Sequence, residues 1–264
     1  MTKTKKIIII IVTVVLLAAF FIWVLLPRII FKSFADKYLD DCFDVKGSYF
    51  EAENYSVTND SYVTVSNKYI SLDIPADLVP YNDFPDENGY PRFYFTEPKT
   101  SKSLCLLQPS TDKFDITDPA YTEGMENEAN MKVALEELIE AIESFGNGIP
   151  DSKYNTYKAI YLLEREDNSF WNFNKAVGFN TLGSLRAISV NGYESVYIYE
   201  TDDICGTVLI EKDIDEEKGY SGYSAVFDAY LYDDLNTNYT VMINMESLEE
   251  IYAVINSVEI ISAA

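Results

Sequence analysis

The hydrophobic pattern begins with one uninterrupted apolar stretch near the N-terminus. Residues 7–26 carry no charge and one hydroxyl side chain, that of Thr13. As a helix, this stretch spans roughly 30 Å, which is the thickness of a bilayer's hydrocarbon core. Its 16 Ile, Val, Leu and Phe residues favour insertion by roughly 5 to 10 kcal/mol. We therefore predict a transmembrane helix over residues 7–26.

A cleaved signal peptide is the alternative interpretation of this stretch. Its apolar region would be shorter and would end in a small-x-small site. Ala18-Ala19 is followed by Phe-Phe-Ile-Trp, which is a poor cleavage site. We therefore expect an uncleaved anchor, with Trp23 near the membrane interface.

Positive charges flank both ends of the anchor. A six-residue tail with three lysines precedes it, and Arg28, Lys32 and Lys37 follow it. Lysines concentrated in a short tail favour the cytoplasmic side, and a long following domain crosses largely regardless of its charge. We therefore expect residues 1–6 in the cytoplasm and the C-terminal domain outside the cell membrane.

Beyond the anchor, apolar side chains recur at helical spacing and then become rare. Intervals of three and four residues separate Phe31, Phe34, Tyr38 and Cys42. Such spacing indicates that the helix continues outward as a short stalk over residues 28–43. Residues 44–60 are polar and favour linker or edge structure. A stalk and linker are therefore predicted over residues 27–60.

Short apolar runs rich in β-branched and aromatic residues follow, and these are typical of strands. They occupy residues 62–65, 69–74, 92–95, 104–107, 196–199, 207–210, 225–232 and 239–245. The last two runs predict a hairpin that turns over residues 233–238. Turn-forming residues predict a turn at 86–89 and a long loop over 108–124.

Four segments carry helical signals. The clearest covers residues 127–145, where apolar and acidic side chains occupy opposite faces and Gly146 follows. Two more helices are predicted over residues 152–164 and from 169 into 176–179. Ser247-Leu-Glu-Glu250 has the sequence of a capping box that opens a fourth helix. Residues 258–261 are a last strand or tail.

Three short stretches resemble the PsbP-like α/β/α sandwich, the fold of the extrinsic subunit of photosystem II and of many anchored bacterial proteins. They are residues 69–78, 188–198 and 239–258. The resemblance implies a scaffold that binds partners and has no shared active site. The order of strands and helices predicts an α+β fold, with one extracytoplasmic domain over residues 61–264 built on an antiparallel sheet covered by helices.

Charge restricts the partners of this domain. The chain from residue 32 onward holds all 43 acidic residues and 16 of the 20 basic residues, which gives a formal charge of −27. Such a surface repels phosphate backbones, so we expect no nucleic-acid partner. Solubility alone is a sufficient reason for this charge.

The sequence contains no histidine. This excludes Ser-His-Asp and Cys-His nucleophilic sites, His-ligated zinc and imidazole acid-base catalysis. Carboxylate pairs, lysines and all-oxygen metal sites stay open. The three cysteines, Cys42, Cys105 and Cys205, cannot all pair within one chain. Cys105 lies in an apolar run and is expected to be a buried small hydrophobe.

Two short motifs are weak matches to known sites. Ser110-Thr-Asp-Lys113 has the Ser-x-x-Lys spacing of penicillin-recognising enzymes, but Phe-Asp-Ile-Thr-Asp-Pro follows where a buried helix should begin. Asp213-Ile-Asp-Glu-Glu217-Lys-Gly219 is similar to a calcium loop, but its glycine is one place late and Ser224 replaces the bidentate glutamate. A charged hairpin turn is the simpler interpretation of residues 213–219.

Further patterns carry no site on their own. Gly219-Tyr-Ser-Gly222 lacks the final glycine of a nucleophile elbow, since residue 223 is Tyr. Asn54, Asn59 and Asn238 head glycosylation sequons, which matter only in a eukaryotic host. The abundant tyrosines are compatible with a glycan-stacking surface, although strand packing explains them equally well.

Two classes of function stay open after these exclusions. The first is a non-catalytic binding or assembly module of the cell envelope, whose partners are the membrane and another envelope protein. The second is a carboxylate-dependent envelope enzyme, such as a glycan hydrolase. The sequence identifies no catalytic, cofactor-binding or metal-binding residue, and we expect the first class.

Overall fold

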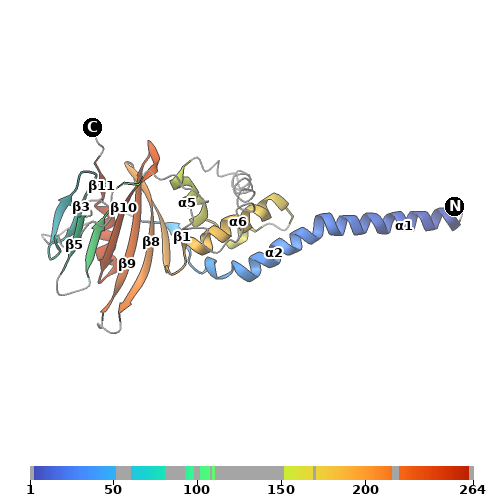
Figure 1. Cartoon of the computed structure of the whole chain (residues 1–264), viewed down its shortest axis with the longest axis horizontal. Helices are drawn as coiled ribbons and strands as arrows, with labels where there is room; N and C mark the ends of the chain where they lie inside the picture. The colour runs from blue at the N-terminus through green and yellow to red at the C-terminus, as the bar shows by residue number, and fades with distance from the viewer. Residues whose placement is uncertain are drawn as a thin grey trace. The chain divides into compact units, whose positions relative to one another are not determined.

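The computed structural model describes residues 3–51, 61–80, 93–97, 102–107, 109–110, 152–168, 171–215 and 220–261. The predicted helix at 127–145, the turn at 86–89 and nearly all of the loop at 108–124 lie outside these residues. The chain is a mixed α+β protein with a long apolar N-terminal helix and a large sheet (Figure 1). It divides into two compact units. Unit 1 is Met1–Asp44, Glu126–Ile149 and Leu163–Ala187, and unit 2 is Val45–Met125, Pro150–Leu162 and Ile188–Ala264.

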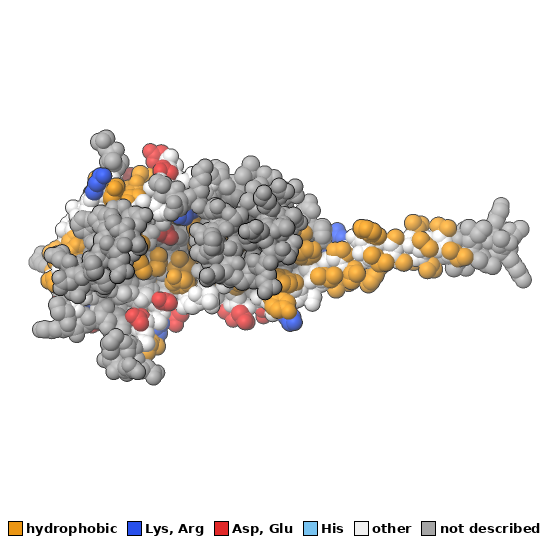
Figure 2. Space-filling view, in the orientation of Figure 1, with side chains coloured by type: hydrophobic (Ala, Val, Ile, Leu, Met, Phe, Trp, Pro, Cys, Tyr) orange, Lys and Arg blue, Asp and Glu red, His pale blue; other side chains and the backbone are white. Residues whose placement is uncertain are grey.

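The N-terminal helix is continuous through three segments: α1 (Lys3–Phe20), the π-helical segment η1 (Phe21–Leu25) and α2 (Leu26–Tyr38). Among the described residues it is the one helix long and apolar enough to cross a membrane. From Ile11 onward, hydrophobic side chains are spread along its surface (Figure 2). The predicted apolar helix is therefore present, and its insertion in a membrane stays a prediction.

The π-helical turn has a cause in the sequence. The backbone N–H of Leu26 donates to the carbonyl of Phe21, five residues earlier. Pro27 follows directly and has no N–H to continue the α-helical ladder. Because proline removes one donor from the helix, a single π-helical turn before it lets the neighbouring backbone carbonyls still accept hydrogen bonds from other N–H groups.

In unit 1, α2 lies against α6 (Phe173–Ser189). Gly183 of α6 lets the helices approach closely, because an added Cβ would lie 2.7 Å from Cδ1 of Leu39. Two 3₁₀ turns, η2 (Asp41–Phe43) and η4 (Arg165–Asp167), complete the described part of this unit. An ion pair of 2.9 Å joins Arg165 to Asp40 across them.

Two expectations for unit 1 need correction. The helix predicted from 169 to 179 starts at Phe173 and continues to Ser189. The apolar residues predicted at helical spacing on the stalk also lie on two different faces. Cys42 is buried together with Ala35 and Leu39, whereas Phe34 and Tyr38 are exposed. The buried face follows the contact with α6.

Unit 2 is built on an eight-stranded sheet in the order β1-β7-β8-β9-β10-β6-β5-β4. The strands are β1 (Gly47–Tyr49), β4 (Val79–Pro80), β5 (Phe93–Thr96), β6 (Ser103–Leu106), β7 (Ser195–Glu200), β8 (Ile204–Asp215), β9 (Tyr220–Leu231) and β10 (Asp234–Met245). Neighbouring strands are antiparallel except at one edge, where β1 pairs with β7 in parallel. The expected sheet is thus mainly antiparallel, and its edge strand β1 arises from the segment expected to be linker or edge structure.

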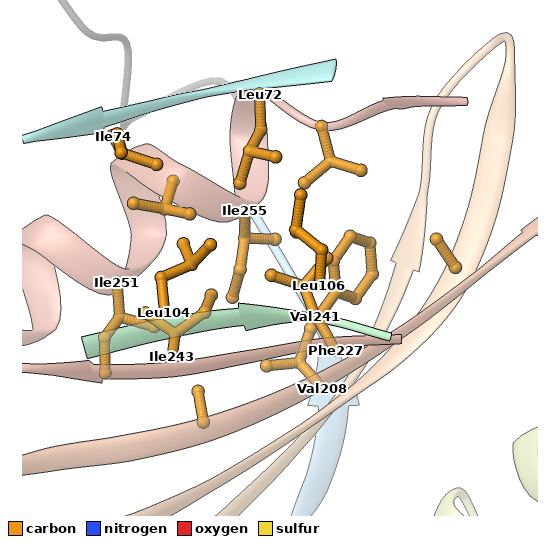
Figure 3. Packing of buried hydrophobic residues seen from close by; sticks show 14 of the residues in the cluster. Leu72, Ile74, Leu104, Leu106, Val208, Phe227, Val241, Ile243, Ile251 and Ile255 are labelled. Atoms are coloured by element: carbon orange, nitrogen blue, oxygen red, sulfur yellow. The ribbon is translucent and has the colours of Figure 1, made fainter. Parts of the chain in front are cut away.

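A second sheet of three strands, in the order β11-β3-β2, shares the core with α7. These elements are β2 (Tyr62–Ser66), β3 (Ile70–Pro75), α7 (Leu248–Asn256) and β11 (Glu259–Ile260). Figure 3 shows side chains from β3 and α7 meeting those of the large sheet, including Phe227, Val241 and Ile243. Each fully buried side chain of this kind contributes about 1.5–3 kcal/mol relative to exposure.

The opposite face of the large sheet receives α5 (Lys153–Tyr161), which contacts β7, β8 and β10. Ser152 caps this helix by accepting a hydrogen bond from the backbone of Asn155 at 3.3 Å. Because both faces are covered here, adjacent residues of β8 such as Val208 and Leu209 are both buried. This explains why residues 207–210 form a continuous apolar run.

Two local expectations in unit 2 are also corrected. The hairpin predicted to turn over 233–238 is tighter, since β10 already starts at Asp234 and absorbs the extra residues in a register shift before Tyr239. Cys105 was expected to be buried but is partly exposed, because Leu104 and Leu106 take the core face of β6. All three cysteines are thiols and no disulfide joins them.

Candidate functional site

The structure describes the weak sequence motifs only in part. Ser110 makes an isolated β-bridge to Asn238, and the rest of its motif lies outside the described residues. Asp213 and Asp215 belong to β8, which pairs with β9 as far as Asp215 and Tyr220. Residues 213–215 are therefore strand residues, and residues 216–219 lie outside the described part of the chain. Ser221 is a paired residue within β9 and not a nucleophile on a turn.

The side-chain amide of Asn238, which heads one sequon, is hydrogen-bonded within the protein. Its amide nitrogen donates to Asp228 at 2.9 Å, and its amide oxygen accepts from Nζ of Lys153 at 2.9 Å. Asn238 itself is buried. Glycosylation at this residue is incompatible with the folded structure, and Asn54 and Asn59 lie outside the described residues.

A more informative cluster forms at the end of β7, where α5 crosses the sheet. Lys158 of α5 forms an ion pair with Glu200, with 2.5 Å between Nζ and Oε1. Tyr154, one helical turn earlier, donates its hydroxyl to the same oxygen at 2.8 Å. The carboxylate of Glu200 therefore joins the helix to the sheet through a shared acceptor.

Two exposed tyrosines flank this ion pair. The Tyr49 ring of β1 lies beneath Nζ of Lys158, with 5.5 Å from Nζ to the ring centroid. Tyr232 donates its hydroxyl to the carbonyl of Thr201, next to Glu200, at 2.9 Å. The exposed fractions are 53% for Tyr49 and 48% for Tyr232. We call the surface formed by Tyr49, Tyr154, Lys158, Glu200 and Tyr232 the tyrosine–lysine surface.

The ionisation of this surface follows from its contacts. Partial burial alone would raise the pKa of Glu200, but hydrogen bonds from Lys158 and Tyr154 outweigh it and hold this pKa below the ordinary value. Burial alone would lower the pKa of Lys158, whereas Glu200 raises it. Desolvation raises the pKa of Tyr154. Both charges of the pair are thus stabilised in the folded protein.

The buried thiols are not activated. Desolvation raises the pKa of Cys205, which lies beneath this surface, to about 12. Desolvation also raises the pKa of Cys42 in unit 1, despite the opposing charge of Arg186. Because the thiolate is the nucleophilic form, neither group is suited to nucleophilic catalysis.

A second charged cluster surrounds Lys102, at the start of β6. Its Nζ lies 2.8 Å from Glu250, 3.5 Å from Asp77 and 3.8 Å from Glu246. Burial alone would lower the pKa of Lys102, but the hydrogen bond that Lys102 donates to Glu250 and the three negative charges raise it. Glu250 is also the capping-box residue of α7, whose backbone N–H bonds to Ser247 at 3.2 Å. This cluster connects three segments of unit 2 and leaves its lysine charged.

Sequence reasoning identified neither cluster. Lys158 and Tyr154 lie four residues apart, so helical spacing places them on one face of α5. Tyr49, Glu200 and Tyr232 come from three different strands, and no local pattern indicates that they meet. Only the capping box at Ser247 and Glu250 was visible in the sequence, and the structure confirms it.

No family model matches this chain, and no curated protein matches it. The structure therefore defines a class by architecture alone: a mixed α+β chain with an N-terminal helix long and apolar enough to cross a membrane.

Proposed function

We propose that this chain is a membrane-anchored, extracytoplasmic binding or assembly module of the cell envelope. It acts by contact with another envelope protein and not by catalysis. The observation that carries this proposal is the tyrosine–lysine surface, where Tyr49 and Tyr232 are about half exposed around a fixed ion pair. Tyrosines of this kind provide large contact areas at low entropic cost and are enriched at protein interfaces.

Rigidity supports a role in recognition. Lys158 and Glu200 hold each other in place, and Tyr154 fixes the carboxylate from the buried side. A partner that packs on Tyr49 and Tyr232 would meet side chains already in position, which lowers the entropic cost of binding. Tethering confines the surface to a thin layer beside the membrane and raises its effective concentration for other membrane-attached molecules.

The alternative function, a carboxylate-dependent hydrolase, requires a carboxyl group whose pKa is raised so that it can act as an acid. The pKa values of Glu200 and Asp234 are shifted in the opposite direction, below their ordinary values. Neither Glu200 nor Asp234 therefore fits the role of a general acid.

The proposal is tested by separating the domain from its anchor. Residues 1–31 are replaced by a cleavable signal, so that the same domain is secreted free. Crosslinking in cells should recover a protein partner with the anchored form and much less of it with the free form. A free domain that is fully functional, or that turns over a substrate by itself, would contradict the proposal.

The proposed orientation has its own measurement. Protease added to intact cells or spheroplasts should digest the C-terminal part while residues 1–6 stay protected. A C-terminal part that resists protease until the membrane is permeabilised would show that the domain is cytoplasmic.

A further inference from the structure

The contacts between α2 and α6 fix the direction of α6 relative to the anchor. The Asn180 amide donates to the carbonyl of Phe31 at 3.3 Å. Further along α6, Gly183 lies against Leu39 at the end of α2, and Nε of Arg186 donates to the carbonyl of Cys42 in the following turn η2 at 3.2 Å. Because both sets of residues follow one another in the same order, α6 runs parallel to α2, and its N-terminal end points back toward the anchor.

This direction sets the level at which α6 begins. Phe173 precedes Asn180 by a distance of roughly 10 Å along its helix, and Leu26 precedes Phe31 by roughly 7.5 Å. The two helices therefore begin at about the same level, which is where the apolar span of residues 7–26 ends. Figure 1 shows α6 beside α2 in this arrangement.

Trp171 lies directly in front of α6, at this level. Its side chain is 80% exposed, and that of Trp23 in the anchor is 81% exposed. These two are the only tryptophans of the chain. Indole rings are enriched at the membrane–water interface, where the ring meets acyl chains and its N–H meets water and head groups.

The charge around Trp171 fits a phospholipid surface. The first turn of α6 has no acidic residue, in a chain whose part beyond residue 31 is strongly acidic. Lys175 lies in this turn, and its backbone N–H bonds to Asn172 at 3.2 Å. The positive end of the helix dipole therefore faces the same direction as the lysine, toward the head-group layer.

We propose that Trp171 and the first turn of α6 form a second membrane contact, in which the Trp171 indole enters the lipid interface beside the anchor. This inference rests on the proposed membrane anchor. A second contact would stop α6 from moving away from the membrane surface and would hold it along the membrane normal beside the anchor.

The test uses the two tryptophans as separate reporters in the full chain. W23F leaves Trp171, W171F leaves Trp23, and W23F/W171F/I214W provides an exposed reference on β8, since Ile214 is 54% exposed. Each protein is reconstituted in phosphatidylcholine–phosphatidylglycerol vesicles that contain lipids brominated near the head group. Quenching by these lipids is compared with quenching by iodide present on both sides of the membrane.

The proposal predicts that W23F is quenched by the brominated lipid severalfold more than the I214W reference, and by iodide severalfold less. W171F should also be quenched by the lipid, because Trp23 belongs to the anchor. Lipid quenching of W171F with reference-like behaviour of W23F would overturn the second contact and leave the anchor intact. Absence of lipid quenching in W171F would overturn both the anchor and this inference.

Discussion

At the scale of single residues, Lys102 shows how unit 2 accommodates a buried cation. Its side chain is 9% exposed, while the surrounding carboxylates of Asp77, Glu246 and Glu250 are 24–52% exposed. Removing the ammonium leaves the three carboxylates without their shared cation, at a place where water solvates them only in part. We expect K102M to lower the free energy of unfolding by about 1.5–3 kcal/mol, the range for a charged hydrogen bond.

Urea denaturation measures this change, and K212M is the matched control. Lys212 is an exposed residue of β8, so its substitution should change stability by less than about 0.5 kcal/mol. Equal effects of K102M and K212M would show that the Lys102 cluster contributes no stability.

The pKa of Glu200 predicts a dependence of stability on pH. Its folded-state pKa lies below the unfolded value, so the stabilisation is fully present above the unfolded pKa and is lost as pH falls through the folded pKa. E200Q removes this contribution. The stability difference between wild type and E200Q should therefore shrink from about pH 6 to about pH 3.

Denaturation curves at a series of pH values check this expectation, with E194Q as the control. Glu194 is an exposed residue just before β7. A stability difference for E200Q that stays constant, or grows, as pH falls would contradict the proposed ion pair.

At the scale of elements, the start of α7 rests on two side-chain hydrogen bonds. The Ser247 hydroxyl accepts from the backbone of Glu250 at 3.2 Å, and the Glu250 carboxylate accepts from the backbone of Ser247 at 3.3 Å. Loss of the hydroxyl leaves a helix N–H without its acceptor. We expect S247A to cost about 0.5–2 kcal/mol of stability.

The same denaturation assay tests S247A against S66A, a substitution at an exposed position of β2. Because Glu250 also binds Lys102, the double mutant S247A/K102M should deviate from additivity. Strict additivity would indicate that the cap and the Lys102 cluster are independent.

Elements with local signals were predictable, and those that depend on distant contacts were not. The capping box and the alternating strands of the β9–β10 hairpin depend on neighbouring residues, and the structure confirms them. The extension of α6 to Ser189 was missed because Gly183 is a poor helix former in isolation. In the folded protein the missing side chain of Gly183 leaves space for Leu39, and this contact cannot be seen in the local sequence.

The candidate site was less predictable than the fold for the same reason. Lys158 and Glu200 are 42 residues apart, and the pattern near each indicates only a helix or a strand. Tyr49 comes from a segment whose polarity predicted linker or edge structure, and its pairing with Ile198 places it beside Lys158. Such convergence depends on the order of strands in the sheet, which hydrophobic periodicity does not specify.

At the scale of the whole molecule, the chain joins an apolar N-terminal helix to an acidic α+β region that presents the tyrosine–lysine surface. We propose that this surface contacts another envelope protein. Partner contact should then depend on position, since only residues on the surface lie next to the partner. Tyr49 and Tyr232 meet this condition, and Ile214, which is 54% exposed on β8, is the matched control.

The most direct measurement is site-specific photo-crosslinking in cells, with the full anchored chain carrying a photoreactive amino acid at Tyr49, at Tyr232 or at Ile214. We expect one shared protein adduct from the positions of Tyr49 and Tyr232 and none of it from that of Ile214. An E200Q/K158M variant, which lacks the ion pair, should weaken the adduct. The same adduct from all three positions, or no protein adduct from Tyr49 and Tyr232, would contradict the proposed contact.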